Sequence, residues 1–221
     1  MLLDLLSGDA DGLSLIITFF ARLFVIFCTM PIHEYAHALI ATKLGDQTPR
    51  LSGRLTLNPI AHISPMGAIM MLLCGFGYAK PVSVNPRNFK DTKKGMAITA
   101  LAGPVANLIM GFIFITGSVF MSNLIKNPTI IHFAIYNFLA FAGVLNVNLA
   151  VFNLLPIPPL DGSRILQLLI PAKYYYKFLE YERYVTIVVF ILILTGVLSK
   201  PLSEISSFII DLFNKIASLP F

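Results

Sequence analysis

The sequence LFVIFCTMPIHEYAHALIAT, residues Leu23–Thr42, decides the fold because His33, Glu34 and His37 interrupt an otherwise apolar run. Ionisable side chains are costly in a bilayer and mark functional sites there. On a helix, His33 and His37 lie four residues apart and share a face, so both imidazoles can bind one tetrahedral metal ion. Glu34 lies about 60° around the helix from His37, where it can reach a metal-bound water without being a ligand. The H-E-x-x-H spacing is typical of zinc hydrolases.

The depth of this cluster follows from the charges that flank it. Arg22 and Lys43 bracket the stretch, whose length at about 1.5 Å per residue matches a hydrocarbon core about 30 Å thick. We therefore predict that this helix spans the membrane and that His33 lies near mid-depth, about 15 Å from Lys43. A span over Leu13–Ile32 is the alternative and would place the cluster at the interface. Pro31 removes one helical hydrogen bond, so a kink or a local widening is expected beside the site.

Composition places the chain among helical membrane proteins. Of its 221 residues, 57% are hydrophobic and 12% are charged, and the mean hydropathy is +0.80. Long apolar blocks favour an all-α polytopic membrane protein with about five or six transmembrane segments over a β-barrel, whose strands would alternate. The net charge of +5 is modest and concentrated in short loops, which indicates membrane topology and no nucleic-acid partner. Residues 80–94 carry five cations and one anion, so we expect this loop to be cytoplasmic.

A polar connection follows the first span. Residues 44–64 alternate apolar and polar side chains between turn formers such as Pro49 and Pro59, which predicts a short membrane-associated β-hairpin. Its free edge could pair with an extended substrate, and a surface hairpin without that role is the alternative. His62 either makes a local hydrogen bond or contributes to the site. Met66–Tyr78 is apolar but short, so a short helix and a re-entrant segment are both open.

Two further apolar helices are expected over Gly95–Met121 and Ile130–Leu155. The first carries Asn107, about 18 Å along from Gly95, so this amide also reaches mid-depth and needs a polar partner. Asn146 and Asn148 in the second helix either form hydrogen bonds between helices or contribute to a site.

A proline-rich break follows the second of these helices. The stretch NLLPIPPLDG, residues 153–162, has three prolines in four positions, so its backbone cannot continue the helix. Irregular backbone at membrane depth is tolerated where it is buried in protein or faces a polar cavity. Asp161, presented on this break, is therefore a candidate metal ligand. The alternative is that Asp161 only caps the following helix, paired with Arg164.

Together these residues could form a catalytic set around one Zn²⁺ ion. A catalytic zinc takes three protein ligands and leaves a fourth position for water, and His33, His37 and Asp161 supply three. Such an ion lowers the pKa of its water. Glu34 would accept the proton as the water attacks a carbonyl, and would then protonate the leaving amine. Asn107 would either stabilise the oxyanion or hold the substrate strand.

Three motifs of this chain resemble the signatures of the site-2 protease family of intramembrane zinc metalloproteases. The similarity extends over about Leu23–Leu169 and keeps the family's order. It implies a core of three helices that carries the zinc site, in a chain that cleaves transmembrane segments of other proteins in regulated intramembrane proteolysis. The motifs are HEYAH at 33–37, GPVAN at 103–107 and NLLPIPPLDG at 153–162.

The resemblance also implies roles for single residues. His33, His37 and Asp161 match the family's zinc ligands. Glu34 matches the family's base, and Asn107 matches its polar residue near the substrate.

The chain is expected to form one intramembrane metalloprotease domain over residues 1–221. We expect a catalytic core at about 23–169 and accessory helices at about 184–219. With no room for a PDZ or CBS domain, the chain resembles the short branch of the family. The expected location is a prokaryotic cell membrane, crossed several times, and the expected partners are the lipid bilayer and transmembrane protein substrates.

A metal-binding membrane transporter without proteolytic activity is the main alternative, because His and Asp also line ion pathways. Glu34 argues against it, since a transporter does not need a carboxylate that is not a ligand inside a His-x-x-x-His pair. A zinc protease for prenylated termini is the second alternative. It would place further Glu and His ligands on other helices, and the sequence has no second Glu-His pair of that kind.

Overall fold

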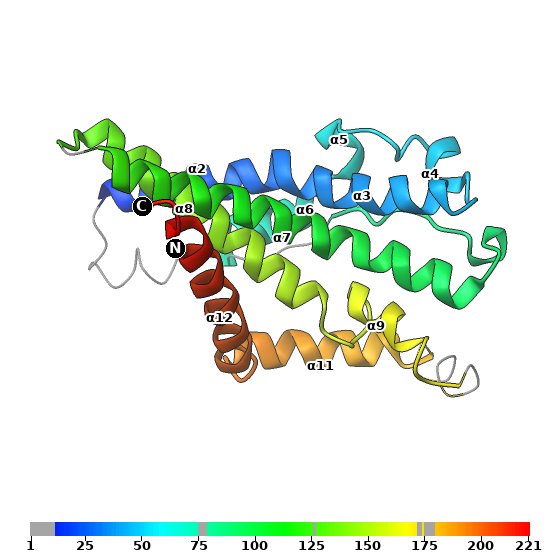
Figure 1. Cartoon of the computed structure of the whole chain (residues 1–221). Helices are drawn as coiled ribbons and strands as arrows, with labels where there is room; N and C mark the ends of the chain where they lie inside the picture. The colour runs from blue at the N-terminus through cyan, green and yellow to red at the C-terminus, as the bar shows by residue number, and fades with distance from the viewer. Residues whose placement is uncertain (1–11, 75–78, 126, 172–173, 175–179) are drawn as a thin grey trace.

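Three long apolar helical stretches form the frame of the protein. The computed structural model describes residues 12–74, 79–125, 127–171, 174 and 180–221. Within them, Gly12–Lys43, Thr92–Leu124 and Ile130–Asn153 are long and apolar enough to cross a membrane, and Figure 1 shows the three side by side. The described residues form helices and no strands, which confirms the all-α prediction. The number of five or six membrane segments stays a prediction.

The first helical stretch is longer than the predicted membrane span Leu23–Thr42. It runs without interruption through α2 (Gly12–Phe24), η1 (Val25–Thr29) and α3 (Met30–Lys43). Arg22 does not end it, because the guanidinium donates a hydrogen bond of 2.8 Å to the carbonyl of Leu72 in the neighbouring α6 (Pro65–Cys74). The helix therefore extends beyond the predicted membrane span on the side of Leu23, and it ends at Lys43, one residue after the predicted end of the span.

The widening predicted beside Pro31 is present as the π-helical turn η1. The N–H of Met30 bonds to the carbonyl of Val25 rather than to that of Ile26. Pro31 follows directly and has no N–H to donate, so a wider turn before it accommodates the proline ring. The helix then continues regularly through the histidines.

The central pair of helices is α7 (Thr92–Leu124) and α8 (Ile130–Asn153). They cross closely where Gly111 faces Val147 and Gly143 faces Ile115, since a methyl group on either glycine would overlap the facing side chain. Small residues allow membrane helices to approach in this way. Helix α3 packs on the other side of α7.

The connection after α3 differs from the prediction. Residues 44–64 contain two short helices, α4 (Thr48–Leu51) and α5 (Pro59–His62), so the predicted β-hairpin was wrong. Each helix has a proline in its first turn, and the Asn58 side chain accepts a hydrogen bond from the N–H of Ile60 to cap α5. The alternation in the sequence therefore reflects helix-starting residues. Residues 66–74 are helical, as part of α6, and the rest of the predicted segment, 75–78, lies outside the described residues.

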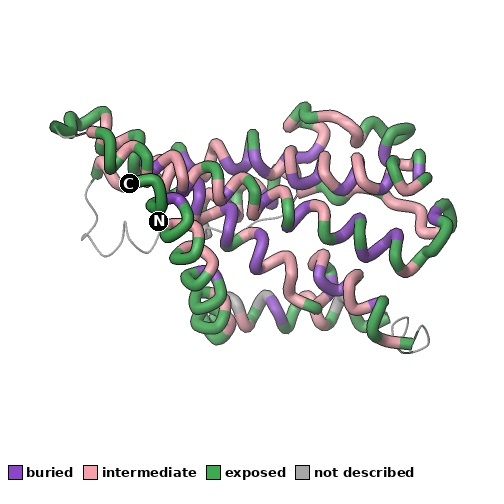
Figure 2. The backbone as a smooth tube through the Cα atoms, in the orientation of Figure 1, coloured by how far each residue is buried: buried purple, intermediate pink, exposed green. Residues whose placement is uncertain are grey.

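Beyond the proline-rich break lie α9 (Asp161–Leu166), α11 (Glu182–Leu194) and α12 (Ser199–Ser218). Helix α9 packs on α7, and α12 crosses both α7 and α8 (Figure 1). Figure 2 shows that buried residues follow the inward faces of the long helices, while their outward faces are exposed. Large apolar side chains are common on those outward faces, among them Ile109, Ile113 and Phe133. An apolar exterior of this kind fits a lipid environment.

Candidate active site

The polar residues of α3 face α7 and are withdrawn from solvent. His33, Glu34 and His37 are only 7%, 9% and 7% exposed. Gly103 of α7 makes room for the two imidazoles, because a methyl group at this position would overlap both rings. The motif that contains Gly103 therefore packs directly against the H-E-x-x-H motif.

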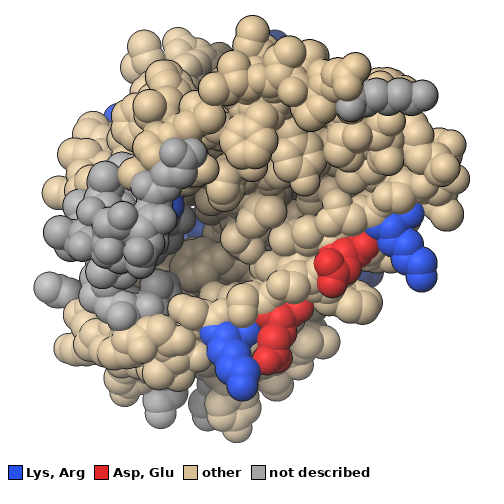
Figure 3. Space-filling view, turned by 90° about the vertical axis from the view of Figure 1, so that its left-hand side faces the viewer, with Lys and Arg blue, Asp and Glu red and all other residues tan. Residues whose placement is uncertain are grey.

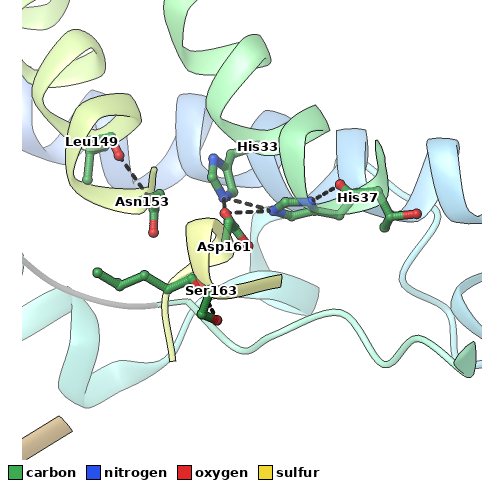
Figure 4. A network of polar contacts seen from close by, with 8 residues as sticks. His33, His37, Leu149, Asn153, Asp161 and Ser163 are labelled. Atoms are coloured by element: carbon green, nitrogen blue, oxygen red, sulfur yellow. Dashed lines mark hydrogen bonds and ion pairs between the residues drawn. The ribbon is translucent and has the colours of Figure 1, made fainter. Parts of the chain in front are cut away.

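The proline-broken segment brings Asp161 against the two histidines (Figure 4). Its Oδ2 atom lies 3.3 Å from Nε2 of His33 and 3.3 Å from Nε2 of His37. Those two nitrogens are 3.0 Å apart. Asp161 is the first residue of α9 rather than its cap, and it forms no ion pair with Arg164 in the part of the chain that the structure describes. Capping paired with Arg164 therefore does not explain the position of this carboxylate.

The donor atoms of this cluster fit a zinc ion. The ligand atoms of His33, His37 and Asp161 lie within 4.8 Å of one another and offer two nitrogens and one oxygen. Nδ1 of His37 is 2.7 Å from the carbonyl oxygen of Thr99, which can only accept a hydrogen bond. Nδ1 therefore carries the proton of the neutral ring, and Nε2 turns its lone pair toward the cluster. Among the described residues, Oδ2 of Asp161 has no hydrogen-bond partner and faces only Nε2 of the two imidazoles.

A cavity of about 330 Å³ adjoins the cluster. Glu34 and Asn107 both line it. Asn107 is 2% exposed, and its Oδ1 atom has no hydrogen-bond partner in the described structure. One wall is the extended segment 79–84, which contributes Ala79, Pro81, Val82 and Val84. The cavity therefore brings Glu34 and Asn107 together in a space that is lined largely by apolar side chains.

The other polar residues singled out in the sequence lie elsewhere. His62 is buried, and its Nε2 lies 2.8 Å from the carbonyl of Thr56, so this histidine makes a local hydrogen bond. Asn146 donates to the carbonyl of Ala142 in its own helix instead of to another helix. Asn148 is exposed. None of the three lines the cavity beside the histidines.

Three polar residues of the cavity wall were not assigned to the site from the sequence, namely Thr99, Asn153 and Arg164. Thr99 orients His37 through its backbone carbonyl, which no side-chain pattern reveals. Arg164 follows Asp161 by three residues, a spacing that places both on one helical face and would have indicated the site. Its guanidinium has no ion-pair partner among the described residues.

Comparison with known proteins identifies the family. The model of "Peptidase family M50" matches residues 121–196. "Putative zinc metalloprotease YwhC" of Bacillus subtilis (strain 168) is 40% identical over 171 residues, which cover 77% of this chain and 78% of the relative. The chain therefore belongs to peptidase family M50, in agreement with the resemblance to site-2 proteases, and is a zinc metalloprotease.

More distant relatives carry similar names. "Putative zinc metalloprotease Rip2" of Mycolicibacterium smegmatis is 33% identical over 141 residues, or 62% of this chain and 52% of the relative. "Zinc metalloprotease MJ0392" of Methanocaldococcus jannaschii is 27% identical over 159 residues, which cover 72% of this chain and 37% of the relative. The chain thus spans about half of the first of these proteins and less of the second. No solved structure matches the chain.

Proposed function

We propose that this zinc metalloprotease cleaves peptide bonds in or near transmembrane segments of other membrane proteins. The observation that carries the proposal is the convergence of His33, His37 and Asp161 beside a cavity that is lined in part by helices of membrane-spanning length. Glu34 lines the same cavity. His33, Glu34 and His37 are withdrawn from solvent on a helix of membrane-spanning length, so peptide segments that already lie in the bilayer are well placed to reach them.

In the proposed site, His33, His37 and Asp161 hold one zinc ion, which when bound supplies a Lewis acid for the water and the substrate carbonyl. Glu34 accepts the proton of the attacking water and later returns it to the leaving amine. Asn107 donates its amide N–H to the oxygen on which negative charge develops. The Thr99 carbonyl keeps the Nδ1 proton of His37 in place throughout.

The variant Glu34→Gln tests the base most cleanly. Glutamine keeps the size of the side chain but cannot accept the proton, so we expect unchanged zinc content and loss of cleavage of a reporter transmembrane substrate. Tyr35→Phe is a matched control, because Tyr35 is next to Glu34 in the sequence but does not line the cavity. This variant should keep its cleavage activity. Retained cleavage in Glu34→Gln would exclude the proposed base.

A metal transporter is the weaker alternative. Arg164 lines the cavity without an acidic ion-pair partner in the described structure, and its charge opposes the passage of a divalent cation. Transport assays on Glu34→Gln separate the two functions. A transporter would still move metal in this variant, whereas the protease would lose its activity.

The wider architecture belongs to the same proposal. Residues 1–221 would form one domain, with a catalytic core at about 23–169 and accessory helices at about 184–219. Shorter helices such as α6 and α11 would complete five or six membrane segments. The domain would lie in a prokaryotic cell membrane.

A further inference from the structure

The last helix, α12, has three distinct faces. The first face is docked on the bundle, where Leu202, Ile209 and Phe213 pack around Ile115 and Val147 of the central helix pair. These three residues of α12 fall within one sector of about 40° at about 100° per residue. The remaining surface of the helix points away from the protein.

The two exposed faces of α12 differ in chemistry. At about 100° per residue, the exposed apolar side chains occupy one sector of about 80°, and all charged side chains occupy the adjoining sector of about 60°. The apolar sector contains Ile205, Phe208, Leu212, Ile216 and Leu219, all at least 43% exposed. The charged sector contains Lys200, Glu204, Asp211 and Lys215, all exposed.

The charged sector argues against a transmembrane position. None of its four side chains forms an ion pair with a described residue, so each would enter hydrocarbon as a lone charge. Although α12 has 20 residues, it is not among the helices apolar enough to span a membrane. An apolar sector beside a charged one instead suits a helix that lies in the membrane interface.

The two ends of the bundle indicate which interface this is. Residues 43–54 and 80–94 together carry eight cations and two anions, whereas α12 carries two of each. By the positive-inside rule the basic end is cytoplasmic. Figure 1 shows α12 at the opposite end of the long helices. Figure 3 views that end and shows positive and negative side chains side by side along a mostly uncharged face.

We propose that α12 lies along the outer interface of the membrane, roughly in the bilayer plane. Phe208 and Leu212 enter the acyl chains, while Asp211 faces the headgroups and water. Lipid covers the apolar sector because α12 is docked on a bundle whose own exterior is apolar. Where the chain leaves α12, Phe221 stacks edge-on with Phe120 of α7, which is itself 52% exposed. The helix thereby holds the bundle at a fixed depth, independently of the chemistry in the cavity.

The absence of tryptophan from the chain gives a direct test of depth. Leu212→Trp and Ser207→Trp place single reporters on the apolar and polar sides of α12 in the full-length protein. The protein is reconstituted in phosphatidylcholine–phosphatidylglycerol vesicles brominated at shallow or deep acyl positions. We expect shallow bromines to quench Leu212→Trp about twofold more than deep ones, and aqueous iodide alone to quench Ser207→Trp.

Two outcomes would overturn the assignment of depth. Stronger quenching of Leu212→Trp by deep bromines would mean that α12 crosses the membrane. No quenching of Leu212→Trp by either lipid would mean that protein, such as a second copy of the chain, covers the apolar sector.

Cysteine labelling tests the side of the membrane. In a background of Cys28→Ala and Cys74→Ala, Asp211→Cys should react with an impermeant maleimide added to intact spheroplasts. Arg50→Cys, at the basic end, should react only after permeabilisation. The reverse pattern would place α12 on the cytoplasmic side and overturn the proposed orientation.

Discussion

Asp46 and Asp161 are two carboxylates that differ in their hydrogen bonding. Asp46 is fully buried and accepts hydrogen bonds from the N–H and hydroxyl of Thr48, the N–H of Asn85 and the amide of Asn88, at 2.6 to 3.0 Å. Oδ2 of Asp161 faces only imidazole nitrogens. The first carboxylate is satisfied by the chain itself and holds structure together, whereas the second keeps coordination capacity for a ligand.

The role of Asp46 follows from what it connects. It joins the turn after α3 to Asn85 and Asn88, which lie at the two ends of η2 (Pro86–Asn88). The segment just before η2 forms a wall of the cavity. Burial raises the pKa of the Asp46 carboxyl, but hydrogen bonds from Thr48, Asn88 and Asn85 outweigh it and hold the pKa below its usual value of 3.8. The carboxylate is therefore ionised at neutral pH and fixes this wall.

Among the variants compared here, the largest effect is expected for Asn107, a buried polar side chain that lines the same cavity as Asp161. Asn107→Ala removes a donor for developing negative charge, so we expect cleavage to fall by about 10²- to 10³-fold with zinc content unchanged. Asn137→Ala is the control, because Asn137 is bonded to Phe133 in its own helix and lies outside the cavity. Activity close to wild type in Asn107→Ala would remove this residue from the mechanism.

Gly103→Ala disturbs the zinc cluster without changing a ligand. Its methyl group would overlap the rings of His33 and His37, so we expect about a 100-fold loss of cleavage, measured on the reporter substrate. Gly117→Ala in the same helix meets only Leu139, at 3.4 Å, and should be nearly neutral. Equal activity in the two variants would show that close packing at Gly103 does not matter for the site.

Asp46→Asn tests whether the Asp46 carboxylate stabilises the fold. The new amide N–H₂ would face donors in place of an acceptor, so we expect the free energy of unfolding to fall by about 1–3 kcal/mol. Denaturant unfolding of the purified protein measures this change. Zinc content should stay at the wild-type level, and a loss of zinc without a loss of stability would contradict the division between the two carboxylates.

The smallest effect concerns pH. Because folding lowers the pKa of Asp46 below 3.8, its contribution to stability is fully present above that pH and is lost as the pH falls through the folded-state value. The difference in unfolding free energy between wild type and Asp46→Asn should therefore shrink on acidification below about pH 4. A difference that stays constant down to pH 2 would mean that the ionised form of Asp46 is not the stabilising one.

The long helices could be predicted from sequence because a chain in lipid must satisfy its backbone hydrogen bonds internally. The predicted Gly95–Met121 lies within the observed Thr92–Leu124. The helix and the predicted span differ at Arg22, where a tertiary contact stabilises a charged residue inside the helix. Arg22 flanks the predicted membrane span, but its guanidinium donates a hydrogen bond to the carbonyl of Leu72 and the helix extends back to Gly12.

The part of the candidate site that depends on the spacing of residues along the chain could be predicted from the sequence. Helical periodicity puts His33 and His37 on one face, and the proline-rich break points to Asp161. The carbonyl of Thr99 and the fit of Gly103 against the rings depend on how α3 meets α7, which local pattern does not encode. The alternation in residues 44–64 was misleading because prolines that begin short helices also interrupt apolar runs.

The zinc content of purified Asp161→Ala, measured by inductively coupled plasma mass spectrometry beside wild type and Asp46→Ala, tests the central claim most directly. With three protein ligands to one ion, wild type and Asp46→Ala should each hold about one zinc per chain, and Asp161→Ala should hold far less. A full complement of zinc in Asp161→Ala would contradict the assignment of this carboxylate as the third ligand.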